Sequence, residues 1–284
     1  MATPKTIKET VETNINHYID HSCFNKSDNI QISIVMATHD RIDQTLFTLK
    51  TINQSAFKQL QVIIVDDSEK QFIDDSSLQS FPYQIDYIKI KKTRDWVNPC
   101  VNYNIAFSFV KGEKVIIQNG EVCHIGDVVS HVNEQLSEGK YVVFDVIACN
   151  NYNDNAFIKS LFPDSLKTAI VAGYGKKKRF AWYQHRVKHS RNYHFLSAIH
   201  INDLKKLGGF DYDYAMDRCF DDNDFIWRIT NLQKLKIQNV GHLIGLHQYH
   251  DRVFLGVTPE QYKQSVGKNS DLYRYKIKEY LKKV

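Results

Sequence analysis

Short apolar runs alternate with segments of helical spacing through the first 120 residues of the chain. Runs rich in β-branched residues, which are typical of buried strands, lie at residues 31–37, 61–66, 85–90 and 114–118. Helices are predicted over residues 42–53 and 99–110, the second opening with a proline that a first helical turn tolerates. Strands that alternate with helices indicate a parallel sheet with right-handed crossovers.

The pattern after residue 120 is less regular. It predicts helices at residues 125–136 and 201–207, from residue 221, and from residue 259 to the C-terminus, with strands at 141–147 and 236–240. Residues 150–195 lack clear periodicity and are interpreted as a long functional loop region. The polar residues 1–28 are predicted to form a helical arm followed by a loop. Because no internal repeat or linker is seen in the sequence, we expect one domain with two lobes.

The composition fits a folded protein with an anionic ligand. Hydrophobic residues make up 43% and aromatic residues 12% of the 284 residues, which is enough for a sizeable core. The net charge of +5 suits an anionic small ligand but is too weak and too dispersed to predict a nucleic-acid partner. The densest basic run, residues 176–179, is interpreted as a solvated loop, with phosphate steering as the alternative.

The five cysteines are scattered and odd in number. No CxxC pair occurs, so neither a zinc site nor a disulfide framework is predicted, and a reducing compartment fits best. The N-terminus has no apolar segment of the signal-peptide type, and no apolar run approaches the length of a membrane span. We therefore expect a soluble, cytoplasmic protein.

Oxygen-bearing side chains stand where ligands are expected in such a sheet. Three acidic sites lie at strand ends or at a helix start: Asp66 with Asp67, Asn119 with Glu121, and Asp221 with Asp222. In an open α/β sheet, ligands bind at the carboxyl ends of the strands. Gly120, between an amide and a carboxylate, lets a phosphate or a metal approach the backbone. The alternatives are simple turns at the first two sites, and a helix start with Asp221 as its N-cap at the third.

These sites occur in an order that resembles family 2 glycosyltransferases of the GT-A fold. The motifs that carry the resemblance are residues 33–41, residues 62–68 (the family's V-D-D strand end), residues 104–113 with Ala106 in place of a glycine, the G-G-F-D of residues 208–211, residues 220–225, and His247 with Gln248. Each motif alone is modest. Their order over roughly residues 30–255 is specific.

The resemblance implies a fold and a division of the chain. The expected GT-A fold is an α/β, Rossmann-like, mostly parallel twisted sheet flanked by helices, with a smaller acceptor lobe. It would occupy residues 29–255, with a nucleotide-binding half over 29–124 and an acceptor half over 125–255. An N-terminal arm of residues 1–28 and a helical tail of residues 256–284 would flank it. We expect the tail helix to pack on its own domain, with a homodimer as the alternative.

A UDP-sugar donor is implied by the same resemblance. The residues expected to bind its nucleotide and sugar are Ala37, Thr38, Arg41, Asp66, Asp67, Arg94, Asn104, Asn119 and Gly120. Either Asp66 or Asp67 is placed to accept the imide N–H of uracil. Arg94 either pairs with phosphate or sugar or forms a surface ion pair. Trp182 and Tyr183 either stack on sugar rings or pack in the core.

The segment with Asn119 and Glu121 is similar to the family's D-x-D motif, although Asn replaces the first Asp and Glu the second. The resemblance makes Glu121 and His247 metal ligands, and the spacing of His250 lets it reach the same ion if that segment is helical. We expect Mn²⁺ (or Mg²⁺), because both bind hard oxygen ligands and Mn²⁺ also accepts imidazole. With one carboxylate lost, a metal-independent enzyme is the alternative.

Asp222 is the predicted general base, and Asp221 is expected to assist acceptor binding or orientation. In a transfer with inversion, one carboxylate takes the acceptor proton as the hydroxyl attacks C1 opposite the departing diphosphate. A carboxylate in the first turn of a helix is kept ionised by the helix dipole. The acceptor, a protein side chain or a glycan, is expected to contact residues 150–195. His185, His189 and His194 in that region are interpreted as acceptor-loop or structural residues.

Two other functions are consistent with the sequence. The substitution at Asn119 suits a catalytically inactive protein that kept a sugar-nucleotide pocket. A sugar nucleotidyltransferase also needs acids at strand ends. It normally carries a Gly-rich phosphate loop near its N-terminus, and residues 33–45 contain no glycine.

Overall fold

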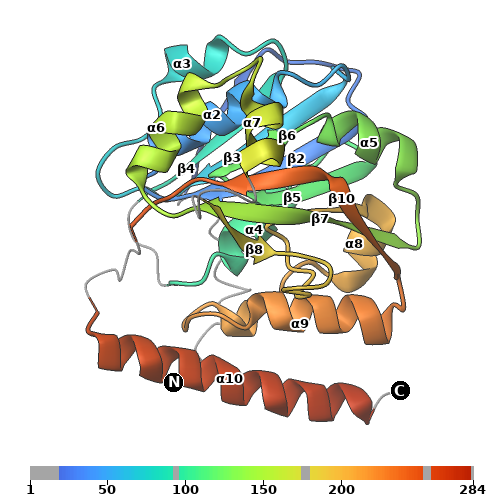
Figure 1. Cartoon of the computed structure of the whole chain (residues 1–284). Coiled ribbons are helices and arrows are strands. Elements are labelled where there is room, and N and C mark those ends of the chain that lie inside the picture. Colours follow the sequence, from blue (N-terminus) through green and yellow to red (C-terminus); the bar gives the residue numbers. More distant parts are fainter. Residues whose placement is uncertain (1–18, 92–95, 174–179, 252–256, 283–284) are drawn as a thin grey trace.

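A ten-stranded sheet forms the centre of the computed structural model, which describes residues 19–91, 96–173, 180–251 and 257–282 (Figure 1). The strand order is β1-β4-β3-β2-β5-β9-β7-β10-β6, with β8 beside β7. The strands are β1 (Ile19–Phe24), β2 (Ile32–Thr38), β3 (Leu60–Asp66), β4 (Gln84–Ile90), β5 (Lys114–Asn119), β6 (Val122–Ile125), β7 (Lys140–Cys149), β8 (Phe180–Gln184), β9 (Leu196–His200) and β10 (Lys236–His247).

The order of strands brings the predicted nucleotide-binding segments to one edge. Strands β4, β3, β2 and β5 are mutually parallel, as the alternation of strands and helices predicts. In this register Thr38 lies opposite Asp66, and Ala37 lies opposite Asn119. Antiparallel β9 then joins β5 to β7. The ends of β2, β3 and β5 therefore form the carboxyl edge at which a ligand is expected.

Helices cover both faces of the sheet (Figure 1). One face carries α2 (Ile42–Ile52), α3 (Asp75–Gln79), α5 (Val128–Gln135), α6 (Tyr152–Ser160) and α7 (Leu166–Gly173). The other face carries α4 (Cys100–Phe107), α8 (Ile201–Leu207), η1 (Tyr212–Tyr214), α9 (Asp221–Trp227), η2 (Arg228–Leu232) and the tail helix α10 (Pro259–Leu281).

Alternate residues of the central strands pack into two separate cores. Ile34 and Ile64 face the α2 side, whereas Val35 and Ile63 face the α4 side, and all four are fully buried. A strand that is covered on both faces needs apolar residues at every position, which explains the uninterrupted apolar runs in the sequence.

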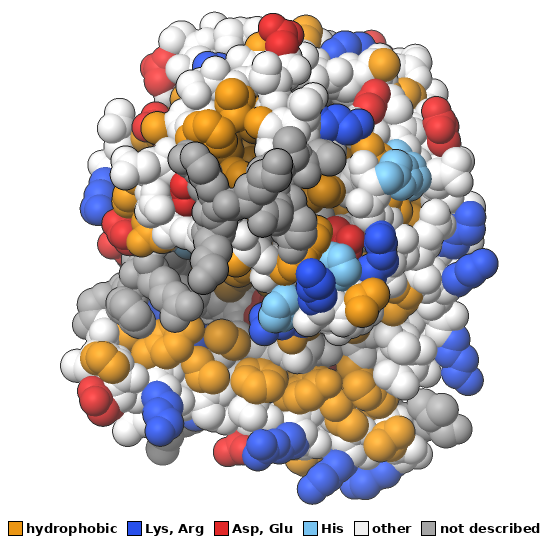
Figure 2. All heavy atoms as spheres, in the orientation of Figure 1, with side chains coloured by type: hydrophobic (Ala, Val, Ile, Leu, Met, Phe, Trp, Pro, Cys, Tyr) orange, Lys and Arg blue, Asp and Glu red, His pale blue; other side chains and the backbone are white. Residues whose placement is uncertain are grey.

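The tail helix α10 packs on its own domain. A capping box at Thr258 starts the helix. Asn269, which is 2% exposed, donates hydrogen bonds to the carbonyls of Tyr214 and Cys219. Figure 2 shows hydrophobic side chains along the line where α10 meets the rest of the molecule, with Lys and Arg side chains on its outer side. The helix thereby holds the chain that leads into α9.

Several elements differ from the sequence prediction. Strands β1, β6, β8 and β9 were not predicted, and β10 is longer than its predicted five residues. The helix predicted from residue 125 begins at Val128, because β6 precedes it. Residues 150–195, predicted as a loop region, contain α6, α7 and β8. Of the predicted arm, residues 19–24 form a strand, and residues 1–18 lie outside the described part. Among the described helices, none combines the length and the hydropathy needed to cross a bilayer.

The close approach of Gly112 to β2 gives a test of the packing. A Cβ atom at Gly112 would lie 2.7 Å from backbone atoms of Ile32 and Ser33, neither of which can rotate away. We expect Gly112→Ala to lower the free energy of unfolding by about 1–3 kcal/mol. Gly267→Ala is the matched control, because nothing lies within 4 Å of that position in α10. It should raise stability by about 0.5–1 kcal/mol, and urea denaturation measures both. Equal effects of the two variants would contradict this packing.

Candidate functional site

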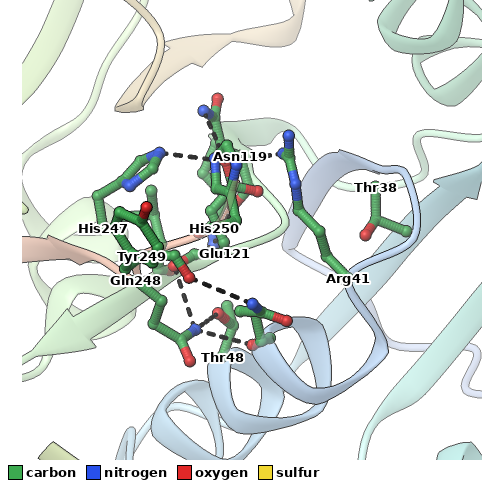
Figure 3. A network of polar contacts seen from close by, with 12 residues as sticks. Thr38, Arg41, Thr48, Asn119, Glu121, His247, Gln248, Tyr249 and His250 are labelled. Carbon is green, nitrogen blue, oxygen red and sulfur yellow. Dashed lines mark hydrogen bonds and ion pairs between the residues drawn. The ribbon is translucent and has the colours of Figure 1, made fainter. Parts of the chain in front are cut away.

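Segments from the start, middle and end of the chain meet at the carboxyl edge of the sheet. Figure 3 shows Arg41, His247 and His250 pointing toward Glu121 in the turn between β5 and β6. That turn lies against β2, since the Gly120 amide donates to the carbonyl of Ala37 at 3.2 Å. A Cβ at Gly120 would sit 3.1 Å from the same carbonyl oxygen, so the close approach requires glycine.

Glu121 is 1% exposed and is the most heavily contacted carboxylate of this edge. Arg41 Nη1 lies 3.0 Å, His247 Nε2 3.2 Å and His250 Nε2 3.4 Å from its Oε1 atom. Burial opposes ionisation of Glu121, but Arg41 and the two histidines hold its pKa well below its usual range. Its second oxygen, Oε2, is buried with no hydrogen-bond partner among the described residues. An ionised carboxylate with an unused oxygen is a potential cation ligand.

The donor atoms of Glu121, His247 and His250 suit a divalent ion. One atom from each residue lies within 4.8 Å of the others. His250 Nδ1 lies 2.9 Å from the carbonyl of Asp251, which makes that nitrogen the donor and turns the lone pair of Nε2 toward Glu121. A lone pair that faces a carboxylate is favourable only when a proton or a cation lies between them. The set of one carboxylate and two imidazoles therefore fits Mn²⁺.

We expected His250 to reach the same ion as His247 if their segment is helical. The segment is not helical, yet both imidazoles lie beside Glu121. His247 is the last residue of β10, and His250 lies in the loop after it. Gln248 holds this loop, because its side-chain amide donates to the carbonyls of Gln44 and Glu121 (Figure 3). Sequence analysis identified Gln248 as part of a motif but assigned it no role.

A cavity of about 190 Å³ lies beside this cluster, between the β2–α2 turn and the start of α4. Its lining residues are Ala37, Thr38, His39, Arg41, Asp67, Val97, Asn98, Pro99, Asn102 and Arg218. Four of these were predicted to bind the nucleotide. His39, Asn98, Asn102 and Arg218 were missed. A signal for His39 was present, since it follows Thr38 within the same strand-end turn.

The two candidate acids of the second strand have different surroundings. Asp66 is fully buried and accepts hydrogen bonds from the Tyr87 hydroxyl at 2.6 Å and from the Ser68 amide at 2.9 Å. It does not line the cavity, so its predicted contact with the nucleotide does not fit this geometry. Asp67 does line the cavity, and His39 Nδ1 contacts its Oδ1 at 3.0 Å. Of the two acids, Asp67 is therefore the one whose position fits a contact with a nucleobase in this cavity.

Three other predicted nucleotide-binding residues require comment. Asn104 contacts the backbone of Phe210 in both directions, donating to its carbonyl and accepting from its amide, both at 2.8 Å. This is a packing role on the α4 side, in place of the predicted ligand contact. Asn119 accepts from the Tyr103 hydroxyl at 3.3 Å and stays at the site. Arg94 lies outside the described residues.

The start of α9 carries the two predicted catalytic acids. The alternative interpretation of Asp221 as the N-cap is wrong. The helix begins at Asp221, and Phe220 precedes it with a φ of 68°. Asp221 is 4% exposed and accepts from Asn98 Nδ2 at 3.1 Å. Burial, with a contribution from the Asp222 charge, raises the pKa of Asp221 to about 6. The side chain of Asp222 is 22% exposed.

Aromatic rings lie between α9 and the cluster formed by Glu121, His247 and His250. The Tyr183 ring lies 4.5 Å from that of His247, and burial together with the charges of Glu121 and Asp222 raises its pKa to about 12. Tyr103 also experiences the charges of both acids. A chain of contacts also links the two acids: Asn119 lies 3.4 Å from Glu121 and 3.3 Å from the Tyr103 hydroxyl, the Tyr103 ring packs on His194, and His194 lies beside Asp222. Glu121 and Asp222 therefore converge on one region of the molecule.

The raised pKa of Asp221 predicts an unusual effect of pH on stability. Its folded-state pKa of about 6 exceeds the ordinary value of 3.8, so the folded protein binds more protons in this interval. Stability is therefore lost as pH rises from 3.8 to 6. Asp221→Asn keeps an oxygen for Asn98 and removes the charge, and it should raise the free energy of unfolding at pH 7 by up to about 3 kcal/mol.

Denaturation at several pH values measures this effect. The gain should vanish below about pH 4, where Asp221 is protonated in both states. The exposed Asp271→Asn in α10 is the control and should change stability by less than about 0.5 kcal/mol. An Asp221→Asn variant that is less stable than the parent at pH 7 would contradict the burial argument.

Comparisons with known proteins bear on this geometry. The sequence model of Glycosyl transferase family 2 matches residues 33–201. A search of curated proteins gave no match. The structure of S. aureus TarS residues 1–349 with UDP-GlcNAc matches with a TM-score of 0.54 and 13% identity, over 83% of this chain and 64% of that one.

Two further TarS structures are similar. The complex of residues 1–349 with UDP matches with a TM-score of 0.50 and 14% identity, over 83% of this chain and 63% of that one. A longer S. aureus TarS chain matches with a TM-score of 0.51 and 14% identity, over 78% and 37% of the two chains. The matched region is thus less than two thirds of each TarS chain, and at these identities the likeness concerns the fold. Together with the family match over more than half of its length, it shows that the chain belongs to glycosyl transferase family 2 and has the GT-A fold.

Proposed function

We propose that the protein is a metal-dependent inverting glycosyltransferase that moves a sugar from a UDP-sugar to a hydroxyl of a protein side chain or a glycan. The observation that carries the proposal is the convergence of an ion-binding cluster and a partly exposed carboxylate. Glu121, His247 and His250 form the cluster, and Asp222 is the carboxylate. UDP as the nucleotide is supported by the TarS structures that contain UDP or UDP-GlcNAc.

The cavity beside β2 would hold the nucleotide. Asp67 offers a carboxylate to the imide N–H of uracil, and His39 fixes the position of that carboxylate. Ala37 and Thr38 form the wall next to the base. Arg218 brings a cation to the same cavity, where it would balance the negative charge of the donor.

Glu121, His247 and His250 would hold Mn²⁺, with Mg²⁺ as a weaker fit because of the two imidazoles. A bound ion would supply Lewis-acid stabilisation of the charge that develops on the leaving diphosphate. Arg41 already contacts Glu121, so it maintains a positive charge next to the diphosphate position. Asn119 would contact the ribose or a water molecule of the site. The Arg41–Glu121 ion pair also favours the alternative of an enzyme that works without metal.

Asp222 would act as the general base in a single displacement. The acceptor O–H bond breaks as its proton moves to Asp222, the acceptor oxygen bonds to C1, and the bond from C1 to the diphosphate oxygen breaks with its electron pair. We also propose that residues 29–124 serve mainly the donor and residues 125–255 mainly the acceptor, with residues 256–284 as a structural tail.

Removal of one imidazole tests the metal site. His250→Ala should weaken Mn²⁺ binding, measured calorimetrically in the presence of UDP, by at least about 10-fold. His189→Ala is the matched control, because His189 is exposed and lies outside the cluster. Mn²⁺ affinity that is unchanged in His250→Ala would favour the metal-independent alternative.

Removal of the base tests the catalytic assignment. Asp222→Asn should lower the transfer rate from a UDP-sugar by about 10²–10⁴-fold. UDP affinity should stay unchanged, because Asp222 does not line the nucleotide cavity. Asp213→Asn, a change in an acid that pairs with Lys276, should keep the full rate. A panel of UDP-sugars that bind without turnover in the unmodified protein would instead favour a catalytically inactive sugar-nucleotide-binding protein.

A further inference from the structure

His194 is a buried histidine that the proposed mechanism does not yet use. It lies two residues before β9 and is 4% exposed. Its ring packs edge-on against Tyr103 and Phe210, with centroids 4.7 Å from each. An imidazole in such an aromatic enclosure has little freedom to rotate, so the direction of its nitrogens is fixed.

The ring lies beside the carboxylate of the proposed base. His194 Nδ1 lies 2.5 Å from Asp222 Oδ1. The neighbouring residue makes a parallel contact, because the Tyr193 hydroxyl accepts a hydrogen bond from Asn223 Nδ2 at 2.7 Å. Two consecutive residues of one segment thus contact two consecutive residues in the first turn of α9. That turn has no side-chain N-cap bond, so these contacts hold it from outside.

The acids around His194 and Asp222 favour a positive charge on the imidazole of His194. Asp221 and Asp222 are adjacent acids, and Asp221 is buried. Burial and the Asp222 charge disfavour ionisation of Asp221, whereas the His194 charge favours it. In return, Asp222 raises the pKa of His194 against the opposing effect of burial. The charge of Asp222 therefore favours the protonated form of His194, which would place one positive charge beside two carboxylates.

We propose that His194 is a positioning residue for sugar transfer: it holds one carboxylate oxygen of Asp222, places its positive charge beside the two acids of α9, and leaves the other oxygen for the acceptor proton. This inference rests on the proposed function. In the transfer step His194 keeps its own proton throughout. The acceptor proton moves to the second oxygen of Asp222, and the bond changes at C1 are those given above.

Other titratable groups also lie around His194 and Asp222 and can affect the pH dependence of transfer. The titratable groups that sense the Asp222 charge are Asp221 on α9, Tyr103 on α4, Tyr141 on β7, Tyr183 on β8, Tyr193 before β9, and Cys219 before α9. Burial raises the pKa of each tyrosine and of the cysteine, which keeps these groups neutral near pH 7. Glu121, His247 and His250 also titrate on the acid side, but every variant compared keeps them. A difference between the acid limbs of these variants therefore reports on Asp221, Asp222 and His194.

Two substitutions separate charge from packing. His194→Asn keeps an N–H donor near the position of Nδ1 and removes the charge. His194→Phe keeps a ring and removes both the donor and the charge. Tyr193→Phe is the control, because it removes the neighbouring contact with Asn223 and leaves the charge of His194 in place. Thermal melting curves identify any variant that fails to fold.

The experiment is the pH dependence of kcat/KM for transfer from a UDP-sugar. Loss of the positive charge should move the acid limb of His194→Asn to higher pH by about one unit, which is a tenfold loss of rate at a fixed pH on that limb. His194→Phe should show the same shift and a lower maximum. The limb of Tyr193→Phe should stay in place. A purely structural role for His194 would lower the rate without moving the limb.

A second measurement does not depend on turnover. The imidazole of His194, assigned in NMR spectra by its absence from His194→Asn, should titrate at lower pH in Asp222→Asn than in the unmodified protein. If the unmodified protein turns over and the acid limbs coincide, the inference is wrong and the proposed function stands. The NMR titration of His194 can depend on Asp222 even if no UDP-sugar is turned over. In that case the proposed function is wrong, and so is the catalytic role of His194 and Asp222.

Discussion

The burial of the Glu121 carboxylate is the constraint on which the rest of the site depends. With 1% of its surface exposed, this group has lost its hydration and needs compensating charge from the protein. Arg41 supplies that charge from the β2–α2 turn, and the imidazoles of His247 and His250 lie beside the same oxygen at the end of β10. One carboxylate thereby ties the β2–α2 turn and the end of β10 to the β5–β6 turn. The same three-sided arrangement is the site at which we propose that a divalent ion binds.

The acids of the site are placed in opposite electrostatic environments. Cationic and imidazole neighbours keep Glu121 ionised, which suits an ion ligand. Burial beside a second acid raises the pKa of Asp221, which leaves the more exposed Asp222 as the carboxylate able to take a proton from an acceptor. Environments that push the pKa values of acids apart are a common way to divide chemical roles in one site. Tyr103 links the two regions, because its hydroxyl contacts Asn119 beside Glu121 and its ring packs on His194 beside Asp222.

Local patterns predicted the central strands, the acids at their ends and the tail helix, because each of these depends on residues that are near in sequence. Strand β1 lies at an edge of the sheet and, of its six residues, buries Phe24 alone, and β9 is five residues long, so neither gave a clear apolar run. The choice between Asp66 and Asp67 depends on Tyr87, which reaches Asp66 from the neighbouring strand. No sequence pattern pairs His194 with Asp222, because the contact arises only when the segment before β9 meets the first turn of α9.

A crystal structure with Mn²⁺ and an unreactive UDP-sugar analogue tests the central claim most directly, with the ion located by its anomalous scattering. Our account predicts an ion bound by Glu121, His247 and His250, uracil against Asp67, and the sugar C1 between the diphosphate and Asp222. An ion bound elsewhere, or a sugar whose C1 faces away from Asp222, would contradict it.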